Sequence, residues 1–282
     1  MLYYLKVSRP GLWFATIWLY FLPTGQQYAL FESWIFWYGL FYVCFPLNFI
    51  VYGWNDIVDF ETDKFNLRKD SFWFGARASK EQLERLWKPI LWSQVLFFTP
   101  LLYFGSWKLG IVYILFIFIN ALYNLPRNGL RSKPPFELVA QIGYLLIVPL
   151  SILINELNSI PWMTYVYLLL FAWQSHLIGE VMDIDPDRKA GRKTTATLLG
   201  MKGTKILIIT IVSLEVTLMY FHYQEFIFGS LLACGLLWLL IDLLIIYKTK
   251  RYSYKQMKLF AILSNAVAIV SMIYVWYSGC LI

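Results

Sequence analysis

The chain has 282 residues, of which 59% are hydrophobic and only 15% are charged, and its formal net charge at pH 7 is +7. Soluble globular domains contain about 25% charged residues, so this composition excludes an ordinary soluble protein and indicates a chain whose partner is the lipid bilayer. The basic excess does not indicate nucleic-acid binding, because the sequence has no soluble basic domain.

A helix that crosses a bilayer needs roughly 20 mostly apolar residues. Seven charge-free runs approach this length, and two further apolar stretches are interrupted only by Glu215 and Asp242. The first run is longer than the apolar core of a signal peptide, so it predicts a membrane helix. In chain order the nine predicted spans are 10–31, 33–55, 89–107, 109–126, 138–155, 157–179, 206–224, 226–247 and 259–282.

Lys and Arg are retained on the cytoplasmic side of membrane spans. If the N-terminus is cytoplasmic, 23 of the 24 basic residues border the inner connections and only Lys108 lies outside. The predicted fold class is therefore an all-α polytopic membrane protein with nine transmembrane helices and a cytoplasmic N-terminus. We expect a multi-pass protein of a prokaryotic cell membrane, with its chemistry in the longer cytoplasmic connections.

Two of these connections contain acidic clusters that match each other. The first, NDIVDFETD, covers residues 55–63, and the second, GEVMDIDPD, covers residues 179–187. Their acids recur at the same four offsets, and four predicted helices separate them, so both clusters emerge on the same side of the membrane. This pattern predicts a single membrane domain over residues 1–282 with an internal repeat of a four-helix unit.

An α-helix advances about 100° per residue, so three of the four acids in each cluster share one face. Like charges on one face repel each other unless a cation lies between them, and oxygen-only ligands favour Mg²⁺. Two facing clusters could hold two or three ions that bridge one diphosphate. The fourth acid of each cluster, Glu61 or Asp185, points away and is expected to be dispensable. The predicted metal ligands are Asn55, Asp56, Asp59, Asp63, Glu180, Asp183 and Asp187.

A diphosphate needs more neutralisation than metal ions supply, and Arg can bind its oxygens bidentately. Basic residues follow both clusters and occupy the connection between them. Most are expected to be topology residues, with Arg68, Lys133 and Lys193 as the preferred diphosphate ligands. Pro186 predicts a kink in the second acidic stripe. The candidate cations are Arg68, Lys69, Arg127, Arg131, Lys133, Arg188, Arg192 and Lys193.

The acids could instead cap helices or line a solvated loop, but two matching copies at one membrane depth argue against these roles. A transporter is the alternative from another class, although transporter sites usually lie near the bilayer midplane rather than at helix ends. Polar residues inside the spans are expected mainly to form hydrogen bonds between helices. They are Asn48, Asn120, Gln141, Gln174 and His176, while Glu215 and Asp242 have no assigned role beyond pairing with each other or with Lys.

The motifs resemble those of the UbiA superfamily of intramembrane prenyltransferases. Residues 55–63 fit the family's N-D-x-x-D-x-x-x-D, and residues 180–194 fit D-x-x-D-x-x-x-D followed by D-R-x-x-G-x-x-T. The resemblance covers nearly the whole chain. Further matching positions are Arg68 after the first motif, Tyr123 to Pro126 with Arg131 and Lys133 at the end of the fourth helix, and Arg9-Pro10 near the N-terminus.

The resemblance implies helices around a central cavity that opens to lipid. It also implies Mg²⁺-dependent transfer of a prenyl group from an isoprenyl diphosphate to a lipophilic acceptor, an aromatic or quinone precursor or another isoprenoid lipid, with release of diphosphate. The implied catalytic residues are Asp59, Asp183, Arg68, Lys193 and Tyr123. The implied substrate-binding residues are Arg9, Asn55, Arg68, Tyr123, Arg131, Lys133, Arg192 and Lys193.

Two departures from the family pattern qualify this expectation. Glu180 stands where the family usually has Asp, which moves a carboxylate by one methylene. Residues 66–69 lack the Arg-Pro of quinone-directed members and look more like branches that elongate carotenoids. A carotenoid (lycopene) elongase-type or terpene-cyclising enzyme is therefore the alternative within the family.

Overall fold

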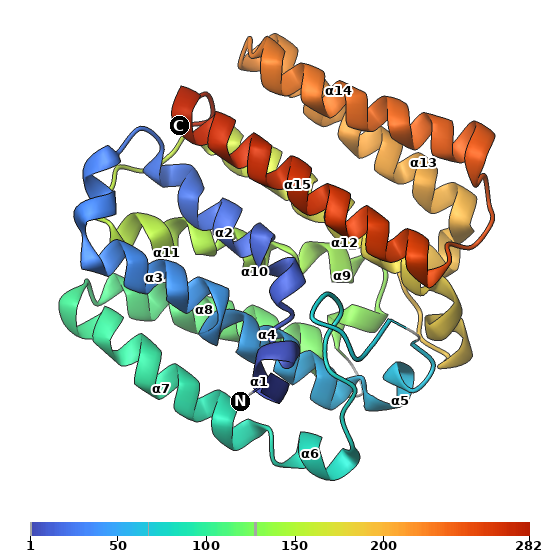
Figure 1. Ribbon diagram of the computed structural model, residues 1–282, viewed down its shortest axis with the longest axis horizontal. Coiled ribbons are helices and arrows are strands. Elements are labelled where there is room, and N and C mark those ends of the chain that lie inside the picture. Colours follow the sequence, from blue (N-terminus) through green and yellow to red (C-terminus); the bar gives the residue numbers. More distant parts are fainter. Residues whose placement is uncertain (1, 67, 127–128) are drawn as a thin grey trace.

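The computed structural model describes residues 2–66, 68–126 and 129–282. Secondary structure in these residues is helical apart from one isolated bridge between Ser71 and Gly75, so the all-α prediction is confirmed. Figure 1 shows long helices lying side by side, with α13 and α14 at one edge. The helices are α1 (Leu2–Val7), α2 (Trp13–Phe21), α3 (Trp34–Cys44), α4 (Pro46–Val58), α5 (Phe60–Asp63), α6 (Lys80–Glu84), α7 (Trp87–Phe104), α8 (Lys108–Asn124), α9 (Phe136–Val139), α10 (Ile142–Leu145), α11 (Ile147–Ile154), α12 (Trp162–Lys189), α13 (Thr195–Thr217), α14 (Phe226–Ile241) and α15 (Tyr254–Ser278).

Within the described residues, five helical segments are long and apolar enough to cross a membrane. Helices also lie over the other predicted spans, among them the shorter apolar α8. The multi-pass membrane character is thus confirmed, whereas the count of nine spans and the cytoplasmic N-terminus remain predictions. The five segments are Trp34–Val58, Phe136–Ile154, Thr195–His222, Phe226–Ile246 and Tyr254–Ser278.

Short polar side chains fix where the long helices begin. The hydroxyl of Thr194 accepts from the backbone N–H of Thr197, and Thr197 accepts in return from the backbone N–H of Thr194, which forms a capping box at the start of α13. Ser253 and Gln256 form the same arrangement at the start of α15. Pro46 occupies the first position of α4, where its missing N–H costs no helical bond.

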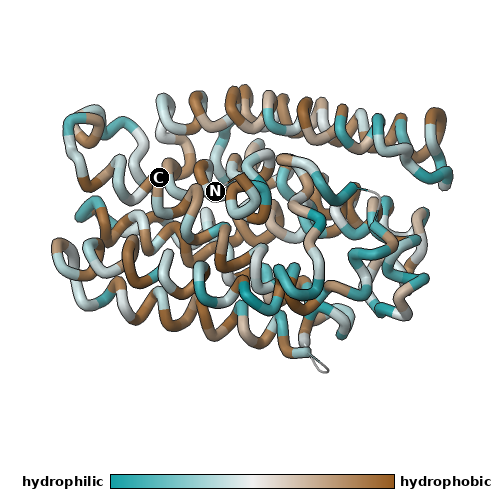
Figure 2. Tube along the Cα trace, turned by 60° about the horizontal axis from the view of Figure 1, so that its bottom comes forward, coloured by the Kyte–Doolittle hydropathy of each residue, from teal (hydrophilic) through white to brown (hydrophobic). Residues whose placement is uncertain are grey.

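The core of the bundle combines aromatic packing with hydrogen bonds between helices. Tyr20 on α2 is fully buried, and its hydroxyl donates to the carbonyl of Phe36 on α3 at 2.8 Å. Tyr42 on α3 donates to Gln94 on α7 at 2.9 Å. Buried polar groups in an apolar bundle need such partners. Figure 2 shows hydrophobic residues along the lengths of the helices and hydrophilic ones gathered mainly toward their ends.

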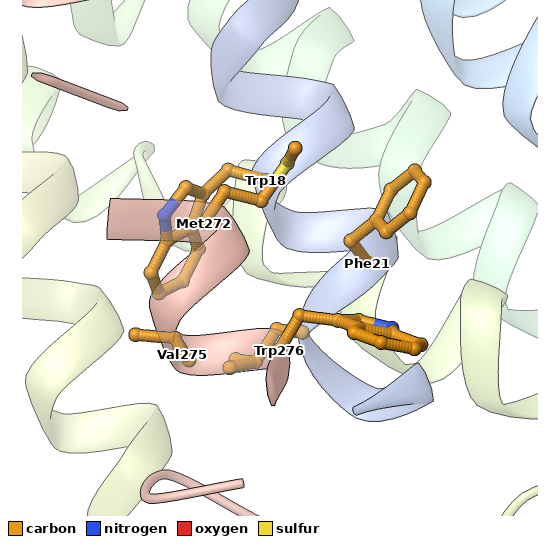
Figure 3. A pocket seen from close by; sticks show the side chains of 6 residues that line it. Trp18, Phe21, Met272, Val275 and Trp276 are labelled. Atoms are coloured by element: carbon orange, nitrogen blue, oxygen red, sulfur yellow. The ribbon is translucent and has the colours of Figure 1, made fainter. Parts of the chain in front are cut away.

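The first and the last long helices pack against each other. Figure 3 shows Trp18 and Phe21 of α2 facing Met272, Val275 and Trp276 of α15 across a narrow apolar gap. At the same contact the indole nitrogen of Trp18 donates to Ser271 of α15 at 3.3 Å. These contacts join two segments that lie more than 200 residues apart in sequence.

Two of the polar residues predicted to join helices do so. Asn48 of α4 donates to Thr16 of α2, and Gln174 of α12 donates to Glu215 of α13, both at 2.9 Å. The prediction is wrong for Asn120, Gln141 and His176, whose polar contacts lie within their own helical segments because partners three or four residues away are nearer. The other unassigned acid, Asp242, pairs with Lys205 at 2.5 Å and not with Glu215.

Candidate functional site

The first acidic cluster lies on a helix that is briefly interrupted. Helix α4 ends at Val58 and helix α5 begins at Phe60. Asp59, between them, has backbone angles of φ −91° and ψ 10°. The N–H of Asp59 still donates to the carbonyl of Asn55, and the N–H of Asp63 to that of Asp59, both at 2.8 Å. Helical spacing therefore persists through the break, as the shared-face prediction requires.

The second acidic cluster lies on an unbroken helix. α12 runs through Pro186 to Lys189 without a break, and a bend of its axis at Pro186 stays a prediction. Pro186 lies in the last turn of the helix, and the backbone hydrogen bond that it cannot donate is the one to Met182. The N–H of Ala190 still donates to the carbonyl of Pro186 at 3.0 Å.

The two clusters meet at one end of the bundle, where α5 contacts α12 (Figure 1). One arginine after each cluster binds an acid of the other. Arg68, after the first cluster, pairs with Asp183 of the second. Arg192, after the second cluster, donates to Asp59 at 3.2 Å and lies 3.8 Å from Asp187. The oxygens of Asp59 and Asp187 are therefore no further apart than these two distances together, about 7 Å.

Asp56 is buried beneath two cations. Arg9 donates to its Oδ1 at 2.6 Å, and the ammonium of Lys69 lies 2.5 Å from the same oxygen. Lys69 also reaches Asp63, at 2.8 Å. Arg9 adopts the left-handed backbone region, with φ 52°, and its guanidinium lies 4.5 Å from the ring centre of Tyr52. The N-terminal segment is thus held against the first cluster.

Asp59 is the most heavily bonded acid of the site. Arg131 pairs with its Oδ1, while the side-chain amide of Asn55 donates to Oδ2 at 2.7 Å, beside Arg192. Asn55 therefore presents its N–H groups to Asp59, and its carbonyl oxygen lies 3.5 Å from the guanidinium of Arg9. Three separate segments thus converge on one buried carboxylate.

Glu180 has protein partners for both of its oxygens. The backbone N–H of Ala196, in the first turn of α13, donates to one oxygen at 2.9 Å, and His176 lies 3.2 Å from the other. Glu137, a buried acid of α9, accepts from the neighbouring N–H of Thr195 at 2.6 Å. The two carboxylates stabilise the positive end of α13. The methylene by which Glu exceeds Asp is what lets residue 180 reach that helix.

Two residues of this site were not predicted from the sequence. Asn66 donates to Asp183 at 3.2 Å, beside the ion pair with Arg68. Glu137 borders the second cluster from α9. Glu137 lies in no acidic run. Asn66 follows Asp63 by three residues and precedes the predicted cation Arg68 by two, but α5 ends at Asp63, so helical spacing alone does not place it.

Some predicted residues lie apart from these contacts. Lys133 and Lys193 are exposed and form no ion pair with the described residues. Arg127 lies outside the described residues. The two acids expected to be dispensable do point elsewhere: they pair with exposed cations at the surface, at 2.6 Å and 2.7 Å. These pairs are Glu61 with Lys64 and Asp185 with Arg251.

Tyr123 lies beside the second cluster at the C-terminal end of α8. Its ring stands nearly perpendicular to that of His176, with 6.3 Å between the ring centres. His176 in turn lies 3.2 Å from Glu180, so an aromatic ring is present near the acids where the resemblance places one.

The charges of the site indicate whether a metal ion fits it. Six acids of the two clusters face five basic side chains: Arg9, Arg68, Lys69, Arg131 and Arg192. Asp187 is the least compensated of the aspartates, since it is 4% exposed and its nearest cation is 3.8 Å away. Burial raises the pKa of Asp187 to about 7, and neighbouring carboxylates add to the shift while Arg192 only partly offsets it.

The oxygen-rich donor set with one under-compensated buried carboxylate fits Mg²⁺. In the described residues, no three acids, histidines or cysteines lie close enough together to hold a metal ion as they stand. The basic side chains keep the carboxylates apart. A metal ion would therefore have to replace some of these ion pairs.

Comparison with known proteins places these observations in a family. The model of the UbiA prenyltransferase family matches residues 12–266. A lycopene elongase/hydratase of Corynebacterium glutamicum is 25% identical over 70% of this chain and 69% of its own length. Another, from Haloarcula japonica, is 28% identical over 82% of this chain and 77% of its own.

Solved structures show the same fold. A UbiA homologue from Archaeoglobus fulgidus bound to DMAPP and Mg²⁺ superposes with a TM-score of 0.66 at 15% identity, covering 96% of this chain and 99% of the homologue. The structure of such a homologue bound to GPP and Mg²⁺ gives a TM-score of 0.62 at 16% identity, covering 95% of this chain and 99% of the homologue.

Proposed function

The chain belongs to the UbiA prenyltransferase family, and from this we propose that it transfers a prenyl group from an isoprenyl diphosphate to a lipophilic acceptor, with Mg²⁺ as cofactor and release of diphosphate. The observation that supports this most is the reciprocal pairing of Arg68 with Asp183 and of Arg192 with Asp59. It brings carboxylates and guanidinium groups from two distant segments together at one end of the bundle.

We propose that the acids of the shared faces hold Mg²⁺, with Asp59 and Asp183 as the central ligands and with Asp56, Asp63 and Asp187 beside them. When bound, Mg²⁺ withdraws charge from a diphosphate leaving group as a Lewis acid. Asn55 and Glu180 take positioning roles here, because their oxygens and N–H groups already have protein partners. Asn55 thereby orients Asp59 for the ion.

The basic side chains are proposed to bind the diphosphate. Arg68, Arg131 and Arg192 hold acids in this structure, and each can turn its guanidinium to phosphate oxygens when a metal ion takes over the acid. Arg9 approaches from the N-terminal segment. The exposed ammonium groups of Lys133 and Lys193 can reach the diphosphate of the donor from the surface.

Tyr123 is proposed to face the allylic end of the donor. Aromatic faces stabilise a nearby cation by about 0.5–2 kcal/mol when desolvated. The ring lies close to the second cluster and to His176, so a prenyl group leaving its diphosphate would develop positive charge next to it. The prenyl tail would extend from there into the apolar bundle, in the central cavity that the resemblance implies.

The relatives favour one acceptor class. Both relatives named above are lycopene elongase/hydratases, and residues 66–69 of this chain look like carotenoid-elongating branches. We propose an acyclic carotenoid as acceptor, and an aromatic or quinone precursor as the second candidate. The chain is proposed to act as one domain over residues 1–282, with its site on the cytoplasmic side of a cell membrane, where 23 of its 24 basic residues would lie.

The test is reconstitution of the purified chain in nanodiscs with dimethylallyl diphosphate and lycopene. We expect release of diphosphate that requires Mg²⁺ and stops with EDTA, together with carotenoids enlarged by five-carbon units in mass spectra. Diphosphate release with a quinone precursor but not with lycopene would identify the second candidate instead. Absence of release with any isoprenyl donor, or ion flux without release, would refute the enzyme assignment of this site.

A further inference from the structure

The spacing of 124 residues that relates the two acidic clusters also relates the basic residues after them. Arg68 and Arg192 are 124 residues apart, and so are Lys69 and Lys193. The two arginines occupy equivalent places, because each pairs with an acid of the opposite cluster. The two lysines do not.

Lys69 is buried between two acids of its own cluster. Its ammonium lies 2.5 Å from Asp56 and 2.8 Å from Asp63, and 4% of its side chain is exposed. Lys193 is exposed and has no ion pair with any acid in the described parts of the chain. The equivalent acids of the second cluster therefore lack the ammonium that Asp56 and Asp63 share.

Lys69 occupies the place that a metal ion would need in the first cluster. Mg²⁺ binds carboxylate oxygens at about 2.0–2.1 Å, so an ammonium bonded to the same oxygens excludes it by contact and by repulsion of like charges. In the second cluster, Asp187 is buried, and its nearest basic group among the described residues is 3.8 Å away. Asp187 can accept a metal ion without first losing a close partner.

We infer that the two halves of the site bind Mg²⁺ unequally, an inference that rests on the proposed function. The half around Asp183 and Asp187 binds the first ion, because its one close ion pair, between Arg68 and Asp183, is more exposed than the pair of Lys69 with Asp56. The half around Asp56 and Asp63 binds an ion only after Lys69 has left, and a bound diphosphate provides the anionic partner that draws its ammonium away. Lys69 is thus a positioning residue that couples the second metal ion to the arrival of the donor.

The experiment measures ion binding rather than turnover. The full-length chain in nanodiscs is titrated with Mn²⁺, and free Mn²⁺ is followed by electron paramagnetic resonance, with and without inorganic diphosphate. Without diphosphate we expect one tight ion and a second that binds about tenfold more weakly or not at all, because a buried ion pair must first be broken. With diphosphate both ions bind tightly.

Matched variants assign the two ions. In the absence of diphosphate, Lys69→Gln should tighten the second ion about tenfold or more, whereas Lys193→Gln should leave the binding of both ions unchanged, because Lys193 is proposed to meet only the diphosphate. In the wild-type background, Asp187→Asn should remove the tight ion and Asp63→Asn the weak one. Thermal unfolding is recorded for every variant, and the wild-type titration alone decides the question if Lys69→Gln does not fold.

Two equally tight ions without diphosphate, or equal effects of Lys69→Gln and Lys193→Gln, would overturn the inference and leave the proposed function standing. A wild-type chain that binds no Mn²⁺ under either condition would overturn the proposed function as well. The stoichiometry thus distinguishes the two failures.

Discussion

Arg192 donates to Asp59 at 3.2 Å although the two residues lie 133 positions apart in sequence. Arg68 completes the same relation in the opposite direction by pairing with Asp183. Each acidic cluster is therefore neutralised partly by the segment that follows the other one. This cross-connection brings the two acidic clusters together at one site.

Loss of a central acid should abolish turnover, whereas loss of an outward-facing acid should not. We expect Asp59→Ala or Asp183→Ala to reduce Mg²⁺-dependent diphosphate release by about 10²–10³-fold, because electrostatic stabilisation of the leaving group is lost. Asp185→Ala should keep most of the activity, since its partner Arg251 lies at the surface. Equal losses in all three variants would contradict the shared-face assignment.

The Arg192–Asp59 contact should act as a pair. Arg192→Lys keeps the charge but loses the planar fork, so we expect the KM for the donor to rise by about tenfold or more. A double-mutant cycle with Asp59→Asn, read by thermal stability without donor, should give a coupling energy of about 0.5–3 kcal/mol. Additive effects would show that the contact contributes nothing in the resting protein.

The binding of Mg²⁺ should depend on pH through Asp187. Because the pKa of this buried acid is raised to about 7 without a metal ion, it is largely protonated at pH 6 and competes poorly for Mg²⁺. Without metal, the same shift lowers the stability of the folded state as the pH rises from about 4, where the unfolded acid titrates, to about 7. The rise in Tm caused by Mg²⁺ should therefore grow between pH 6 and pH 8.

Asp187→Asn is the control for that titration. Its amide does not titrate, so the Mg²⁺-induced rise in Tm should be small and independent of pH. If the variant kept the pH dependence of the wild type, another group would have to be responsible.

Glu180 should behave as a helix cap. Glu180→Gln retains an oxygen that can accept from Ala196, so we expect most of the activity to remain. Glu180→Asp keeps the charge but is one methylene too short, and it should lower the free energy of unfolding by about 1 kcal/mol. A loss of tight Mn²⁺ binding in Glu180→Gln would show instead that the carboxylate is a metal ligand.

The buried pair of Lys205 and Asp242 should stabilise the end of the bundle without taking part in the chemistry. The pair is 2.5 Å apart, and Tyr252 donates to Asp242 at 2.7 Å. Lys205→Met leaves a buried carboxylate without its cation and should cost about 3–5 kcal/mol of unfolding free energy. The double variant Lys205→Met with Asp242→Leu should recover much of that loss, with donor KM unchanged.

The sequence alone predicted the helical segments and the two acidic clusters. It did not predict which residues pair with the acids. Hydropathy located the helical segments, and an even number of intervening helices correctly brought residues 56–63 and 180–187 to the same end of the bundle. The helix that carries the second cluster continues through Pro186 to Lys189. These features depend on local composition and spacing.

Which residue pairs with each acid depends on how the connections between the helices fold. Lys69 and Lys193 occupy equivalent positions in the repeat, yet one is buried and the other is exposed. Asn66 and Glu137 were not predicted as site residues, and the packing of α9 and of the connection after α5 brings them to the second cluster. No periodicity in a single sequence encodes such contacts.

The partners of Asp56 and Asp59 are made at different times during synthesis. Arg9 and Lys69, which form ion pairs with Asp56, belong to the first quarter of the chain. Asp56 can therefore gain both partners early in synthesis. Asp59 can form its ion pairs only after Arg131 and then Arg192 have been synthesised. A nascent chain that ends before residue 192 would leave the Asp59 carboxylate without one of its cationic partners.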